Sequence, residues 1–120
     1  MKFGMPALVE CTDVYDCIEV AKNNSLDFVE INMSFPQYLP DSIDLPKLKK
    51  VLCDSDIFLT IHADEQLNPF DFNKTVSKCY FDVMKSSIRF AVELGIPVIN
   101  MHLLKVYLSL FLPRLLMFLY

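Results

Sequence analysis

The two histidines of the chain stand at the ends of two short apolar runs, and they are the residues with the most evident chemistry. His62 ends the run 57–62, and His102 ends the run 97–102. Such runs are typical of buried parallel strands. Each imidazole is therefore expected where a strand leaves the core, which is where parallel barrels hold their active sites. Because imidazole binds metal ions and titrates near neutrality, the pair predicts a metal, substrate or acid–base site.

A polar residue stands two positions before each histidine. Asn100 precedes His102 in this way, and Thr60 precedes His62. Side chains two apart on a strand lie on the same face of the sheet. The repeated pattern favours a polar pocket lining over a purely apolar core, and Asn100 is a candidate substrate-binding residue.

Three carboxylates accompany the histidines. Glu30 lies near the carboxyl end of the otherwise apolar strand 27–32. It is either a site carboxylate, with a candidate catalytic role, or the partner of a neighbouring lysine or backbone group. Asp64 and Glu65 directly follow His62. They either orient an imidazole, as carboxylates around metal-bound histidines often do, or are solvated in a loop.

Strands and helices alternate along the chain. Helix caps are expected at Thr12 or Asp13, at Asp44, and at Asn73, with Gly95 ending the longest helix. Three prolines indicate a longer loop over 34–46. The predicted strands cover 2–9, 27–32, 57–62 and 97–102. The predicted helices cover about 14–24 and 74–94, and a further helix follows Asp44, with Pro46 in its first turn and Leu48, Val51 and Leu52 on its buried side.

This order predicts an α/β fold made of parallel βα repeats. The two glycines of the chain allow neither a GxGxxG turn nor a phosphate-binding loop, so an open nucleotide-binding sheet loses its main support. Polar residues at the carboxyl ends of successive strands suit a barrel. We therefore expect half of a (β/α)8 TIM barrel, with about four strands and three helices.

Composition narrows the class of protein further. The 120 residues are 53% hydrophobic, which is enough for one packed domain, and the net charge of −4 gives no footprint for a nucleic-acid backbone. The four cysteines lack zinc-site spacing, and Glu10 and Asp13 interrupt the only stretch that resembles a signal peptide. A reducing cytoplasm is the expected location.

Three motifs resemble a known superfamily. They are Phe28-Val-Glu-Ile, then Leu59-Thr-Ile-His-Ala with Asn68-Pro-Phe-Asp behind it, and Leu94-Gly-Ile-Pro-Val-Ile-Asn-Met-His. In this order and spacing they resemble the xylose isomerase-like barrels, which include sugar phosphate isomerases and epimerases and the type IV apurinic endonucleases. The resemblance covers about residues 1–103, the N-terminal half of such a barrel.

The resemblance implies a divalent metal ion, which is zinc, manganese or magnesium. In the endonuclease branch the histidines that match His62 and His102 bind zinc. In the epimerase branch the histidine that matches His62 more often contacts substrate, and later strands hold the metal. Both branches take their acidic ligands from strands five to eight. Two imidazoles, even with Glu30 nearby, would then leave an incomplete site, since a catalytic metal needs about three protein ligands.

The resemblance thus implies a truncated sugar phosphate isomerase or epimerase whose full-length relatives act on small carbohydrates. One alternative is a zinc-dependent apurinic endonuclease, although the acidic charge argues against nucleic acid as a partner. The other is a non-catalytic fragment. Half a barrel exposes two strand edges and an apolar sheet face, so it should associate with other copies unless something covers them.

The segment 104–120 has a different composition. From residue 94 onward, Lys105 and Arg114 are the only Lys, Arg, Asp or Glu residues. The segment is too short and too interrupted for an integral membrane span, yet too apolar to be left exposed. We expect a domain over 1–103, followed by an atypical hydrophobic tail that begins where the ancestral reading frame is lost.

Overall fold

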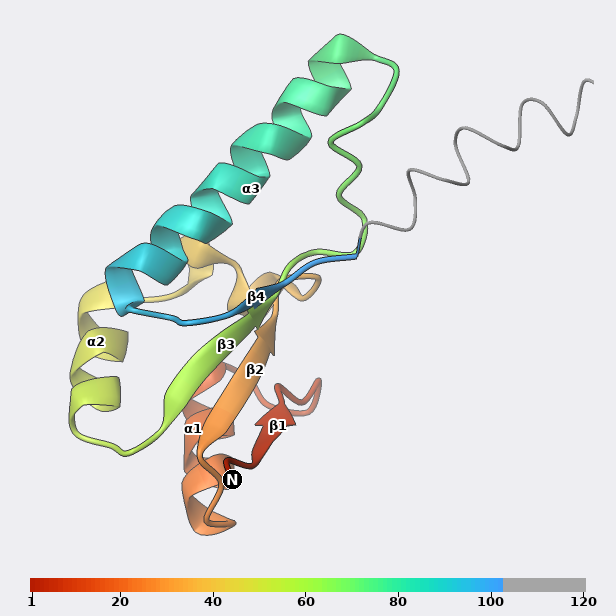
Figure 1. Ribbon diagram of the computed structural model, residues 1–120. Helices are drawn as coiled ribbons and strands as arrows, with labels where there is room; N and C mark the ends of the chain where they lie inside the picture. Colours follow the sequence, from red (N-terminus) through yellow and green to blue (C-terminus); the bar gives the residue numbers. More distant parts are fainter. Residues whose placement is uncertain (103–120) are drawn as a thin grey trace, which may run out of the picture.

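The computed structural model describes residues 1–102 and shows one parallel sheet with strand order β1-β2-β3-β4 (Figure 1). This confirms the α/β class and the predicted alternation of elements. The strands are β1 (Gly4–Pro6), β2 (Phe28–Asn32), β3 (Phe58–His62) and β4 (Ile99–Asn100). The α-helices are α1 (Val14–Asn23), α2 (Leu45–Cys53) and α3 (Lys74–Leu94).

Local side-chain chemistry explains where the helices begin and end. The carboxylate of Asp13 accepts hydrogen bonds from two backbone N–H groups of α1, and Asp44 accepts one from α2. Asn73 caps α3 in the same way. Gly95 ends α3 with φ of 65°, a left-handed conformation that glycine adopts without steric cost. The expected caps at Asp13, Asp44, Asn73 and Gly95 are thus confirmed.

One face of the sheet packs against the helices. Val29 and Ile31 of β2 and Leu59 and Ile61 of β3 are almost fully buried. They join one hydrophobic core with the buried side chains of the three helices, among them Ile18, Leu48 and Phe90. Alternation along the strands therefore directs the intervening residues to the opposite face.

That opposite face changes in character along the strands. At the amino end, the Phe28 and Phe58 rings stack with centroids 5.2 Å apart. Gly4 lies against Phe28, where a Cβ atom would clash with the ring. At the carboxyl end the register aligns Asn32 with His62 and His62 with Asn100. The apolar layer thus lies beneath a polar one at the end where barrels hold their sites.

Two strands are shorter than the sequence predicts. The first was expected over 2–9, but β1 spans Gly4–Pro6, because the chain turns after Ala7 with a hydrogen bond from the Cys11 N–H to the Leu8 carbonyl. The fourth was expected over 97–102, but β4 spans Ile99–Asn100 and pairs with β3 at two positions. His102 therefore lies beyond its strand instead of at its last residue.

The predicted loop over 34–46 contains two short 3₁₀ helices, Pro36–Tyr38 and Pro40–Ser42. Tyr38 anchors this connection in the core. Its hydroxyl donates a hydrogen bond to the Leu8 carbonyl at 2.7 Å and lies 3.3 Å from the sulfur of Cys17. Burial and this thiol raise the pKa of Tyr38 well above its ordinary value.

The atypical tail over 104–120 lies outside the described residues, so the proposed boundary near residue 103 stays a prediction. Within residues 1–102, no helix has the length and apolar character needed to cross a membrane.

Candidate metal and substrate site

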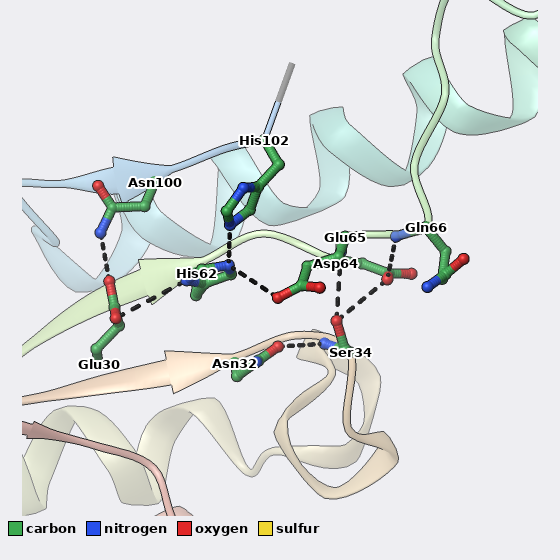
Figure 2. A network of polar contacts seen from close by, with 9 residues as sticks. All are labelled: Glu30, Asn32, Ser34, His62, Asp64, Glu65, Gln66, Asn100 and His102. Atoms are coloured by element: carbon green, nitrogen blue, oxygen red, sulfur yellow. Dashed lines mark hydrogen bonds and ion pairs between the residues drawn. The ribbon is translucent and has the colours of Figure 1, made fainter. Parts of the chain in front are cut away.

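The structure brings together the four residues that the sequence singled out. Glu30 lies on β2, His62 ends β3, and Asn100 ends β4, while His102 follows two residues later (Figure 2). Parallel pairing places the carboxyl ends of the three strands side by side, so residues 70 positions apart in the sequence come into contact. The cluster is a property of the sheet, since a long connection that contains an α-helix separates each of these strands from the next along the chain.

The two imidazoles face each other. The Nε2 atoms of His62 and His102 are 3.0 Å apart, and the ring centroids are 4.9 Å apart with a 38° angle between the rings. Two Nε2 atoms at this distance either form a hydrogen bond with each other or bind the same cation.

Glu30 connects β2 to both neighbouring positions. The amide nitrogen of Asn100 donates a hydrogen bond to Oε1 of Glu30, and Oε2 of Glu30 lies 3.8 Å from Nδ1 of His62. The Glu30 side chain is 26% exposed. Of the two interpretations left open for Glu30, the geometry places it in the histidine cluster, with Asn100 and His62 as its side-chain partners.

Of the two carboxylates after His62, Glu65 reaches the imidazole and Asp64 does not. Oε1 of Glu65 lies 3.5 Å from Nε2 of His62. The Asp64 carboxylate instead accepts hydrogen bonds from the Ser34 hydroxyl and the Gln66 N–H. Both Asp64 and Glu65 therefore make specific contacts in the loop after β3, in addition to any contact with solvent.

These side chains fit a divalent cation. One ligand atom each from His62, Glu65 and His102 forms a group whose members all lie within 4.8 Å of one another. Two ligand atoms bound to one ion at about 2.1 Å lie about 2.9 to 3.5 Å apart when the angle between them is about 90° to 110°. The 3.0 Å and 3.5 Å separations from Nε2 of His62 match this range.

Two further polar residues share this face. Thr60 is buried one layer below His62, and Asn32 lies beside His62 in the sheet register. Asn32 accepts a hydrogen bond from the Ser34 N–H through its side-chain oxygen. Asn32 was not predicted as a site residue, although it occupies the same strand-end position as His62 and Asn100.

Comparisons with known proteins support this architecture. No protein-family model matches the chain, and a search of curated protein sequences finds no significant match. Among solved structures, a D-tagatose 3-epimerase-like protein matches with a TM-score of 0.67 and 28% sequence identity. The match covers 82% of this chain and 36% of the other chain, so this chain spans about a third of the length of that protein.

The structural match and the sequence motifs point to the same fold. The matched structure is that of an epimerase-like protein. The described chain therefore has the fold of part of a xylose isomerase-like TIM barrel, the superfamily that its sequence resembles.

Proposed function

We propose that this chain forms one side of the active site of a metal-dependent isomerase or epimerase of small carbohydrates or their phosphates. The observation that carries the proposal is the cluster of Glu30, His62, Asn100 and His102 at the carboxyl ends of β2 to β4. The similarity to the D-tagatose 3-epimerase-like protein supports a sugar as the substrate.

His62 and His102 would hold the metal ion through their Nε2 atoms. A bound divalent ion supplies Lewis acidity to a carbonyl or hydroxyl oxygen of the substrate. Imidazole nitrogen favours zinc over manganese and magnesium, which are better suited to oxygen ligands. In this arrangement Nδ1 of His62 carries its proton toward Glu30, and a carboxylate in that position orients the ring and increases its basicity.

Glu30 is the candidate catalytic group of this chain. Isomerisation or epimerisation next to a carbonyl requires a base that removes a proton from carbon. The hydrogen bond from Asn100 holds the Glu30 carboxylate toward the histidines, and the second N–H of the amide is a donor suited to a sugar hydroxyl. Epimerisation also requires an acid on the opposite face of the carbon, which we assign to the part of the barrel beyond this chain.

Sugar binding tests the proposal directly. Saturation-transfer NMR is recorded on the full chain mixed with a ketohexose, in a buffer that contains zinc and no manganese. Magnetisation transfer from the protein to the sugar should be seen, and it should depend on zinc. Asn100→Ala should reduce the transfer because it removes a donor, whereas Asn24→Ala, at the end of α1, is the matched control and should leave it unchanged. Absence of transfer from the zinc-loaded wild-type chain would contradict a carbohydrate site.

One observation favours the apurinic endonuclease alternative, namely the contact between the two histidines that match its zinc ligands. Incision of a duplex that contains one abasic site, dependent on zinc and on His102, would support it. The net charge of −4 is unfavourable for binding a phosphate backbone, so we place it second.

A non-catalytic, associating role is the remaining alternative. Along α3 the apolar side chains of Phe81, Val83, Ile88 and Val92 are more than two-fifths exposed, which leaves the helix largely without apolar cover among the described residues. Sedimentation measurements decide the matter: metal-free oligomers would favour this role, and a monomer that binds zinc tightly would favour the enzyme.

For the location, we propose the reducing cytoplasm. All four cysteines are free thiols in the structure, as expected for a protein of that compartment.

A further inference from the structure

We propose that Glu65 is the third ligand of a metal site that residues of this chain complete by themselves, and that Ser34 positions it. The inference rests on the metal dependence of the proposed function. It replaces the expectation that the missing ligands must come from later strands with a site formed by His62, Glu65 and His102.

One imidazole nitrogen of the site, Nε2 of His62, has two polar neighbours. Nε2 of His62 lies 3.0 Å from Nε2 of His102 and 3.5 Å from the Glu65 carboxylate. An imidazole nitrogen offers either one N–H or one lone pair, so a single linear hydrogen bond at this atom satisfies one of the two neighbours and leaves the other without a full partner there. A cation between the three ligand atoms satisfies all of them at once.

The other nitrogen of the His62 ring also lies near a carboxylate. Nδ1 of His62 faces the Glu30 carboxylate, at 3.8 Å from Oε2. This is the side on which a metal-bound histidine usually meets an orienting carboxylate. Glu30 and Glu65 therefore occupy opposite ends of the same imidazole. Glu30 is placed to orient the ring, and Glu65 is placed to share the ion.

Hydrogen bonds from Ser34 hold the loop that carries Glu65 in place (Figure 2). The Ser34 hydroxyl accepts a hydrogen bond from the Glu65 N–H at 3.3 Å and donates one to Oδ1 of Asp64 at 3.2 Å. The Ser34 N–H in turn donates to Oδ1 of Asn32 at 2.8 Å. Ser34 thus ties the loop after β3 to the end of β2, next to the site.

This link also explains why Glu65, and not Asp64, is the ligand. The Asp64 carboxylate is engaged by the Ser34 hydroxyl and the Gln66 N–H, which fixes the turn of the loop. The Glu65 side chain is 53% exposed, and its longer stem can adjust to an ion between the two rings. Ser34 is therefore a positioning residue, acting through the backbone of Glu65 without contact with the metal.

Zinc titration of the full chain by calorimetry, with Co²⁺ absorption as a second readout, tests the site. Glu65→Gln should weaken zinc binding by about tenfold or more and reduce the intensity of the tetrahedral Co²⁺ band. Glu93→Gln, at the far end of α3 and paired with Lys49, is the matched control and should bind zinc like the wild type. Unfolding by circular dichroism without metal confirms that each variant folds.

Ser34 is tested by substitution and rescue. Ser34→Ala should weaken zinc binding by a smaller factor than Glu65→Gln, and Ser34→Thr, which keeps the hydroxyl, should restore it. The inference is overturned if zinc binds with dependence on His102 but not on Glu65, an outcome that leaves the proposed function intact. Glu65-dependent zinc binding without any sugar binding would instead contradict the proposed function and support this site.

Discussion

Replacement of Tyr38 by phenylalanine removes a single hydroxyl from the junction of α1, β1 and the loop over 34–46. The ring of Tyr38 is fully buried, so phenylalanine fills the same space and the change isolates the polar contacts. These are the hydrogen bond to the Leu8 carbonyl at 2.7 Å and the contact with the Cys17 sulfur at 3.3 Å.

The expected loss of stability follows from these two contacts. A neutral hydrogen bond contributes about 0.5 to 1.5 kcal/mol net, and a thiol is a weak partner. The Leu8 carbonyl also loses its phenol donor. We therefore expect Tyr38→Phe to lower the free energy of unfolding by about 1 to 2 kcal/mol at neutral pH, or the melting temperature by roughly 5 to 10 °C for a domain of this size.

The same variant has a defined pH dependence. Because the folded-state pKa of Tyr38 is raised above its ordinary value of 10.0, the wild type loses stability as pH rises above about 10, when the unfolded chain ionises first. Phenylalanine cannot ionise. Urea unfolding at pH 7 and above pH 10 should therefore show a difference between the two proteins that narrows at high pH. Equal free energies of unfolding for the wild type and Tyr38→Phe at pH 7 would refute the reasoning. A difference between them that stays constant from pH 7 to above pH 10 would refute it as well.

Three further changes have measurable outcomes. Gly95→Ala should cost about 1 kcal/mol in urea unfolding, since alanine must adopt the left-handed conformation; a gain in stability would contradict the assigned cap. Thr12→Ala removes the hydroxyl hydrogen bond that lowers the pKa of Asp16, so the stability deficit of the variant should be present above pH 3.8 and be lost as pH falls below this value through the lowered pKa. Burial raises the pKa of the Cys11 thiol to about 11, so iodoacetamide at pH 8 should modify the exposed Cys53 and Cys79 before Cys11, as peptide mass spectrometry can show.

Much of the fold follows from local signals. Asp13, Asp44 and Asn73 mark helix starts because each side chain bonds to the N–H groups that immediately follow it. The lengths of the strands are harder to predict from the sequence, since they depend on how far the neighbouring strand pairs. Residues 97–102 carry a strand-like pattern, yet β3 pairs with Ile99–Asn100 and no further in the described chain.

The candidate site also has a part that the sequence predicts and a part that it does not. The convergence of Glu30, His62 and Asn100 was predictable, because parallel strands end at one edge of a sheet. The direction of Glu65 was not, because it depends on a loop conformation that Ser34 fixes from 31 residues away in the sequence. Adjacent carboxylates in a loop give no signal of which one faces the imidazole.

The central claim is that the histidine cluster holds a divalent ion, and diffraction at the zinc absorption edge tests it most directly. Crystals of the chain grown with zinc should show an anomalous peak within about 2.0 to 2.2 Å of Nε2 of His62 and His102 and of a Glu65 carboxylate oxygen. Two imidazoles that stay hydrogen-bonded to each other, with zinc elsewhere or absent from the map, would contradict the account.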